Sequence, residues 1–162
     1  MIDEVDRLVE AWQRERPDLD VSPLEVLSRV SRLARHLERQ RGVIFARHEL
    51  DASMFDVLAA LRRAGPPHQL SPGQLLAATL VTSGTMTNRI DRLERRALVR
   101  RLPDPVDARS VRVQLTAAGR RKVDAALGDL LEREHAILSP LNERERAATA
   151  RLLRALLAPF DG

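Results

Sequence analysis

The sequence contains no cysteine and no tyrosine, and its only tryptophan is Trp12. The absence of cysteine excludes disulfides, thiolate metal sites and redox sensing by thiol chemistry. Aromatic residues make up only 2% of the chain, so its core must be built from leucine, valine and alanine, which favours a mostly helical fold. No stretch approaches the roughly 18 apolar residues of a membrane span, and the first residues are too acidic for a signal peptide. We therefore expect a cytoplasmic protein.

The positive charge of the chain is unevenly distributed. The net charge is +4, but residues 82–121 hold ten arginines against four acids, a net of +6, which leaves −2 for the rest. A basic block within a nearly neutral chain indicates an anionic partner, most often nucleic acid. On charge alone, a solvated helix with internal charge pairs is the alternative.

Helix signals in the first third of the chain predict three helices. A short amphipathic helix is expected over 3–15. Ser22-Pro23-Leu24-Glu25 combines an N-cap, a first-position proline and a capping-box glutamate, and opens a long helix that runs to about residue 47. Ser53 and Asp56 predict a capping box for the next helix, which stops at the Gly65-Pro66-Pro67 turn.

The remaining two thirds follow the order of a winged helix-turn-helix. Ser71 to Gln74 opens a short helix, and a further helix is expected over about 83–96. Alternating apolar residues then predict a β-hairpin. Long helices beginning near Thr116 and Asn142 complete the chain. The hairpin strands are expected over 98–102 and 110–115. The length of 162 residues is that expected of a single domain.

Residues 83–96 separate into an apolar and a polar side when they are placed on a helix. The apolar stripe consists of Met86, Ile90, Leu93 and Ala97. The other side carries short polar groups that can approach base edges and arginines that can reach phosphate or guanine. An ordinary surface helix shows the same pattern, but the position after a helix and a short helix favours DNA recognition. From this side we expect DNA contacts by Ser83, Thr85, Thr87, Asn88, Arg92 and Arg95.

The loop between the two strands supplies two more expected DNA contacts. Arg109 stands at its far end, where a side chain can enter an adjacent minor groove. Asp107, two residues earlier, is placed to orient that guanidinium. A carboxylate that only stabilises the turn is the alternative for Asp107.

Several segments together resemble the MarR family of transcription regulators. They are Ser83-Gly-Thr-Met-Thr-Asn-Arg-Ile-Asp-Arg-Leu-Glu94, Leu98-Val-Arg-Arg101, Asp107-Ala-Arg109-Ser110 and Leu115-Thr-Ala-Ala-Gly119. The resemblance covers about residues 22–158. It implies a mostly α fold, in which a winged helix-turn-helix with a two-stranded β wing (51–115) lies between dimerisation helices (3–47 and 116–160). It also implies a homodimer whose two recognition helices bind a pseudo-palindromic operator in double-stranded DNA.

Trp12, Asp56, Arg89 and Arg101 are interpreted as a site for a flat anionic ligand. Arg89 lies beside the apolar stripe of its helix rather than on the DNA-facing side, and an arginine next to an aromatic ring suits such a ligand. A buried carboxylate at Asp56 would need a partner. The alternatives are dimer packing for Trp12, a capping role for Asp56, and phosphate contacts for both arginines.

The same four positions are similar to the urate-responsive branch of the MarR family. Members of that branch add an N-terminal helix bearing a tryptophan. The tryptophan, an aspartate before the short helix and an arginine in the recognition helix line the urate site, and an arginine in the first wing strand relays binding. The resemblance implies these roles for Trp12, Asp56, Arg89 and Arg101. It implies a repressor that is released from DNA by urate, a related purine or another phenolic or aromatic ligand.

Nothing in the sequence indicates catalysis, a cofactor or a metal. There is no glycine-rich phosphate loop and no Ser/His/Asp or metal-spaced cluster. A winged helix that contacts protein or RNA instead of duplex DNA, without a ligand response, is the other class of function left open. It predicts weak, salt-insensitive duplex binding. The four histidines are scattered, at His36, His48, His68 and His135.

Overall fold

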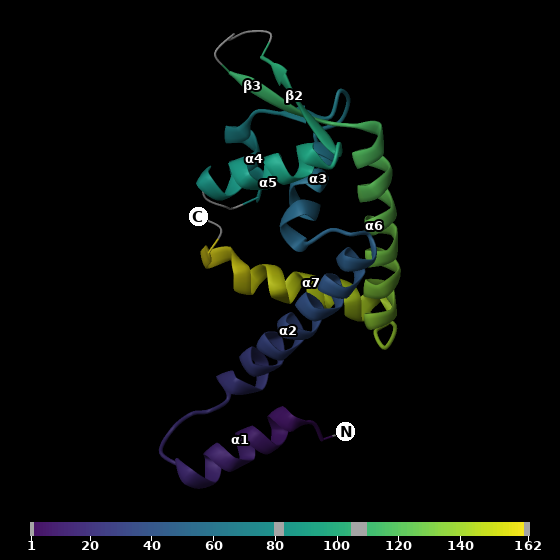
Figure 1. Ribbon diagram of the computed structural model, residues 1–162. Coiled ribbons are helices and arrows are strands. Elements are labelled where there is room, and N and C mark those ends of the chain that lie inside the picture. The colour runs from purple at the N-terminus through teal and green to yellow at the C-terminus, as the bar shows by residue number, and fades with distance from the viewer. Residues whose placement is uncertain (1, 80–82, 105–109, 161–162) are drawn as a thin grey trace. The chain divides into compact units, whose positions relative to one another are not determined.

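The computed structural model describes residues 2–79, 83–104 and 110–160 (Figure 1). The chain divides into two compact units, Met1–Ala52 and Ser53–Gly162. The first unit contains two helices, α1 (Glu4–Glu15) and α2 (Pro23–Arg47). The elements that follow are α3 (Ala52–Arg63), β1 (Gln69–Leu70), α4 (Pro72–Thr79), α5 (Ser83–Arg95), β2 (Val99–Pro103), β3 (Val111–Leu115), α6 (Ala117–Ile137), α7 (Glu143–Leu157) and the 3-10 helix η1 (Ala158–Phe160).

Helix α1 begins with a capping box. The Asp3 carboxylate accepts hydrogen bonds from the backbone N–H groups of Val5 and Asp6, at 2.7 and 3.0 Å. The Asp6 carboxylate accepts in return from the backbone N–H of Asp3, at 2.7 Å. These contacts satisfy donors that the first turn of a helix leaves without partners. Val5 and Val9 are the residues that α1 buries.

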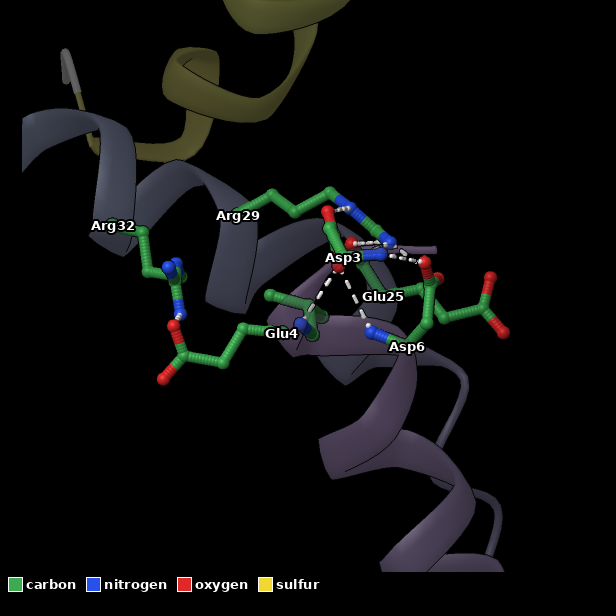
Figure 2. Close-up of polar contacts among 7 residues, drawn as sticks. Asp3, Glu4, Asp6, Glu25, Arg29 and Arg32 are labelled. Atoms are coloured by element: carbon green, nitrogen blue, oxygen red, sulfur yellow. Dashed lines mark hydrogen bonds and ion pairs between the residues drawn. The ribbon is translucent and has the colours of Figure 1, made fainter. Parts of the chain in front are cut away.

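Two arginines of α2 hold the first turn of α1 (Figure 2). Arg29 donates from Nε and Nη2 to Asp3, and its Nη2 lies 2.5 Å from Oδ1 of Asp6. Arg32 forms an ion pair with Glu4. The hydrogen bond from Arg29 holds the pKa of Asp3 at about 2, below its usual range. The carboxylate that caps α1 therefore also joins it to α2.

Ser22 is the N-cap residue of α2, as predicted, but the capping hydrogen bond expected of its side chain is absent. Pro23 occupies the first turn as expected, but Ser22 has helical backbone angles, φ −55° and ψ −33°, and its side chain makes no capping hydrogen bond. An N-cap side chain needs a more extended backbone to fold back on the first turn. The backbone N–H of Ser22 instead donates to the carboxylate of Asp20, at 3.0 Å.

The start predicted for α3 is also wrong. The helix begins at Ala52, so Ser53 lies inside its first turn and is not the N-cap. The rest of the helix follows the expected pattern, because Val57, Leu58 and Leu61 are completely buried. At two other predicted helix starts a capping pair is present, Ser71 with Gln74 and Asn142 with Glu145.

The wing is one strand larger than the sequence predicts. The strand order is β1-β3-β2, and both pairings are antiparallel. Strands β2 and β3 form the expected hairpin, with Val99 opposite Leu115, and it projects from the helices of its unit (Figure 1). Strand β1 pairs Gln69 with Gln114. It has only two residues between the turn at Pro66-Pro67 and the start of α4 at Pro72, too few to show an alternating pattern.

Much apolar surface on the last helices remains uncovered in a single chain. Helix α7 buries none of its residues, and all of them are among those described. Leu157 is 56% exposed and Leu131 of α6 is 45% exposed. An amphipathic helix that buries nothing within its own chain has an apolar face available for a partner. The exposed leucines of this surface are Leu127, Leu131, Leu152, Leu153, Leu156 and Leu157.

Candidate nucleic-acid interface

Helix α5 is anchored by one apolar stripe, as predicted. Met86, Ile90 and Leu93 are 1%, 2% and 0% exposed. The prediction that Ala97 is the fourth member of this stripe is wrong, because Ala97 lies beyond the end of the helix and is exposed. Its backbone is left-handed, with φ 54°, and its N–H donates to the carbonyl of Glu94 while the next N–H donates to that of Leu93. This is a Schellman termination with alanine where glycine is usual.

The opposite side of α5 faces outward. Thr85, Thr87, Asn88, Arg92 and Arg95 are all exposed. Among the described residues, the Asn88 amide has no hydrogen-bond partner, and Arg95 donates only to a backbone carbonyl of its own helix, at 3.3 Å. Amide and guanidinium groups presented in this way are available to base edges and phosphates. Ser83 is the first residue of the helix, and its side chain lies outside the described part.

Strand β2 is bound to the flank of α5 by Arg101. Its guanidinium donates to the carboxylates of Asp91 and Glu94, and its backbone N–H donates to Oε1 of Glu94 at 2.9 Å. The hydrogen bond to Asp91 raises the pKa of Arg101, with a smaller contribution from Glu94. The bridge offsets one of the two negative charges of Asp91 and Glu94, so that Arg92 and Arg95 dominate the charge of the outward side of α5.

The wing carries further basic side chains that the sequence reasoning did not single out. Arg100 donates to the amide oxygen of Gln114 on the neighbouring strand, at 2.9 and 2.6 Å. Arg112 pairs with Asp104 at 2.7 Å. In β3, the alternation of Val111, Arg112 and Val113 was the available signal for a polar side of the strand. The predicted contacts Asp107 and Arg109 lie outside the described residues.

The four residues of the predicted ligand site are distributed over both units. Trp12 is 49% exposed on α1 in the first unit, and the other three belong to the second. The expectation of a buried carboxylate at Asp56 is wrong, because this residue occupies the exposed side of α3. Arg89 is partly buried, and its Nη1 is inaccessible to solvent and has no hydrogen-bond partner among the described residues.

The described part of the chain shows no group of three or more histidine, aspartate or glutamate side chains placed to hold a metal ion. Within the same residues, no helix combines the length and the apolar character needed to span a membrane.

Comparisons with known proteins place this geometry in a family. Residues 48–110, from the end of α2 to the wing, match the MarR family. Over 158 residues the chain is 41% identical to the HTH-type transcriptional regulator PecS of Dickeya dadantii, covering 98% of this chain and 93% of that protein. The chain belongs to the MarR family. Its relatives are transcriptional regulators and not enzymes.

Two solved structures show what MarR-family proteins of this fold bind. A cysteine-to-serine mutant of Escherichia coli MarR complexed with operator DNA has a TM-score of 0.69 and 26% identity, covering 86% of this chain and 99% of that one. Bordetella bronchiseptica BpsR, whose DNA binding is regulated by 6-hydroxynicotinic acid, has a TM-score of 0.61 and 32% identity, covering 79% of this chain and 98% of that one. The mostly α winged helix-turn-helix predicted from the sequence is therefore confirmed.

Proposed function

We propose that this MarR-family regulator is a homodimeric repressor of a pseudo-palindromic operator, released from DNA by a planar anion such as urate or a related purine. The outward side of α5 carries this proposal, since Asn88 and Arg95 have side chains with almost no partners within the protein. Asparagine can bond an adenine edge through two hydrogen bonds, and arginine can do the same with guanine. Thr85, Thr87 and Arg92 extend the same surface. We assign Ser83, Asp107 and Arg109 to the interface on sequence grounds alone.

The uncovered leucines of α6 and α7 support the homodimer. A two-fold pair buries the same patch on both subunits, so one exposed apolar face is enough for association. It also presents two copies of α5 to sites about one helical turn apart on one side of a duplex. The operator is then expected to show two-fold symmetry.

The buried Nη1 of Arg89 supports an anionic effector. A guanidinium N–H buried without a partner is costly, and an anion bound beside it would supply the missing acceptor. BpsR responds to 6-hydroxynicotinic acid, a flat molecule with a carboxyl group, which favours a planar anion for this chain as well. Urate remains a proposal, founded on the residues that resemble the urate-responsive branch. We assign Trp12, Asp56 and Arg101 to the site on the same grounds.

Release from DNA requires that the ligand bind one conformation of the dimer better than the other. A coupling of about 1–3 kcal/mol between the two sites corresponds to a 5- to 150-fold loss of operator affinity. Arg101 is well placed to transmit this change, because it contacts α5 from the first strand of the wing.

A labelled fragment from the gene's own upstream region tests the proposal by fluorescence anisotropy. We expect tight binding at low salt, weaker binding at high salt and release by millimolar urate. In the same samples, urate should quench Trp12, and Arg89→Ala should abolish the quenching without abolishing DNA binding. The exposed Arg14→Gln, which removes a charge from α1, serves as the control. Weak duplex binding that does not change with salt concentration would favour the protein-binding module. Release by 6-hydroxynicotinic acid but not by urate would exclude a purine effector and leave the DNA-binding repressor in place.

A further inference from the structure

Helices α5 and α6 meet at a corner formed by Ala97, Leu98 and Thr116. The wing separates the two helices in the sequence, but its strands pair Val99 with Leu115 and so bring the end of α5 next to the start of α6 (Figure 1). Leu98 is 4% exposed, and all residues of the corner belong to the second unit. The contacts described below are therefore internal to one compact unit.

Leu98 is hydrogen-bonded to both helices through its own backbone. Its N–H donates to the carbonyl of Leu93 in the last turn of α5, at 3.0 Å. Its carbonyl accepts from the backbone N–H of Thr116 at 3.1 Å and from the Thr116 hydroxyl at 3.0 Å. A single buried residue thus links the end of α5 to the residue that caps α6.

The Thr116 hydroxyl has two roles at this corner. It accepts from the backbone N–H of Gly119 at 3.0 Å, which caps α6. Its one proton is shared between the carbonyls of Ala97 and Leu98, at 2.8 and 3.0 Å. A hydroxyl both donates and accepts, whereas a carboxylate only accepts and a methyl group does neither. Substitutions of Thr116 can therefore separate the cap of α6 from the link to α5.

A small change of angle at this corner becomes a large displacement at the far end of α5. The helix has 13 residues, so it is about 20 Å long at a rise of about 1.5 Å per residue. A rotation of about 10° about its last turn moves its first turn by about 3.4 Å, which equals the rise of one base pair along DNA. Thr85, Thr87 and Asn88 lie towards that far end. The corner therefore sets the position of the side chains proposed to read bases.

Helix α6 connects the corner to the apolar surface proposed to form the dimer. Leu127 and Leu131 of this helix are 39% and 45% exposed. They lie about 16 and 22 Å beyond Thr116 along the helix axis. In a two-fold dimer formed through this surface, the angle between α5 and α6 fixes the distance between the two copies of α5.

We propose that Thr116 is a positioning residue that holds α5 at a fixed angle to α6 and thereby makes the dimer selective for the spacing between the two half-sites of its operator. The proposal rests on the dimeric DNA binding proposed above. Base contacts read each half-site separately, whereas spacing is read only through the rigidity of the connection between the two recognition helices. One inserted base pair shifts a half-site by about 3.4 Å and rotates it by about 35°, so a rigid dimer cannot contact both half-sites.

Fluorescence anisotropy of the full-length protein with three labelled duplexes tests this proposal. The duplexes are the operator from the gene's own upstream region, the same operator with one base pair inserted at its centre, and a single half-site. We expect the wild type to bind the inserted operator about 100-fold less tightly than the operator, because only one half-site can then be read. This ratio of affinities is the measure of spacing selectivity.

Three substitutions of Thr116 separate its two roles. Thr116→Asp keeps an acceptor for the N–H of Gly119 but has no proton for the two carbonyls, and Thr116→Val loses both roles. Both variants should reduce the ratio about tenfold, since each dimer loses two links that are each equivalent to a factor of about 2–12. Thr116→Ser keeps the hydroxyl and should retain the wild-type ratio. The charge of Thr116→Asp cancels, because each ratio compares two duplexes with the same variant.

Asn142→Ala is the matched control for the loss of a helix cap. Asn142 accepts from the N–H of Glu145 at 3.0 Å and so caps α7, and its side chain has no other hydrogen bond with the described residues. The exposed leucines of α7 begin at Leu152, about two and a half turns further along. This variant should retain the wild-type ratio. Circular dichroism establishes that the helices of each variant are intact.

Equal ratios in the wild type and Thr116→Asp overturn the proposal. A reduction confined to Thr116→Val also overturns it, because the cap of α6 would then be responsible, and so does an equal reduction in Asn142→Ala. A wild type that accepts the inserted base pair without loss, but prefers the operator to the half-site, overturns this proposal alone. A wild type that binds the half-site as tightly as the operator overturns the proposed dimeric function as well, so the two failures are distinguishable.

Discussion

Gly119 lies so close to Leu98 that a Cβ at residue 119 would stand 2.0 Å from the Leu98 carbonyl oxygen. The same carbonyl accepts hydrogen bonds from the backbone N–H of Thr116 at 3.1 Å and from its hydroxyl at 3.0 Å. The Thr116 hydroxyl also accepts from the N–H of Gly119 at 3.0 Å, which caps α6. The start of α6 is therefore fixed against the segment that joins α5 to the wing. Only glycine fits at residue 119, because any side chain there would overlap the Leu98 carbonyl.

Gly119→Ala is expected to destabilise the protein by about 2–3 kcal/mol or more, because the new methyl group meets a backbone carbonyl and not a flexible side chain. Gly128→Ala on the same helix is the matched control. Nothing lies within 4 Å of a Cβ at residue 128, so this change should stabilise α6 by about 0.5–1 kcal/mol. Urea denaturation measures both free energies of unfolding. Equal effects of the two substitutions would refute the close contact.

Ala97→Gly is expected to stabilise the protein by about 0.5–1 kcal/mol. The left-handed backbone at residue 97, φ 54°, strains alanine and not glycine. The free energy gained by relieving this strain exceeds the entropic cost of the more flexible glycine in the unfolded chain. Ala125→Gly, at an exposed position inside α6, should have the opposite sign, with a loss of about 1 kcal/mol. Thermal unfolding of the two variants gives the comparison, and a loss of stability in Ala97→Gly would contradict this account of the end of α5.

Arg101→Gln should weaken duplex binding several-fold with little loss of stability. The substitution leaves Asp91 and Glu94 as uncompensated negative charges on the recognition helix, close to DNA phosphates. The control is Arg62→Gln, which breaks an exposed ion pair with Asp124 elsewhere in the unit. A partly exposed pair of this kind contributes about 1 kcal/mol or less to folding. Fluorescence anisotropy with a labelled operator distinguishes the two variants, and equal affinities would show that the bridge has no part in DNA binding.

The junction of α1 and α2 should lose its ion pair only in strong acid. The pKa of Asp3 is lowered to about 2 by Arg29, from an ordinary value of 3.8. A lowered pKa contributes stability that is complete above the ordinary value and is lost as the pH falls towards the folded one, here from about 4 to about 2. Asp3→Asn keeps a capping side chain and removes the charge. It should destabilise the protein at pH 7 and have a much smaller effect at pH 2, where about half of the Asp3 carboxyl groups are protonated.

Trp12 emission during urea denaturation at the two pH values checks this prediction. A destabilisation by Asp3→Asn of the same size at both values would assign the effect to the cap and not to the ion pair. High salt at pH 7 should reduce the difference between the variant and the wild type, because all three charged side chains are exposed.

Local patterns in the sequence were sufficient to predict α5 and its two sides. Three apolar residues at helical spacing fix which side is buried, and the arrangement of Met86, Ile90 and Leu93 was predicted before any coordinates. Ala97 was misplaced because helix periodicity alone does not show where a helix ends. The left-handed alanine that ends it lacks the usual glycine signal.

The contacts that were not predicted are those between distant segments. Strand β1 is defined by its pairing with β3, more than 40 residues later in the sequence. Its two residues are too few to show the alternation of apolar and polar residues that predicts a strand. Arg101 was singled out, but its partners on α5 depend on how β2 packs against that helix. The exposure of Asp56 likewise follows from which side of α3 packs inward, and a single acid within an apolar stretch does not reveal this. Asp107, Arg109 and the domain boundaries stay predictions.

The salt dependence of operator affinity tests most directly whether the outward side of α5 binds DNA. Wild-type protein, Asn88→Ala, Arg92→Gln and Arg95→Gln are titrated onto one duplex at several salt concentrations. We expect each arginine variant that loses a phosphate contact to reduce the slope of log affinity against log salt by about one. Asn88→Ala should cost about 1–3 kcal/mol on the operator and nothing on unrelated duplexes. Wild-type slopes and affinities in all three variants would contradict the assignment of α5 as the DNA-reading helix.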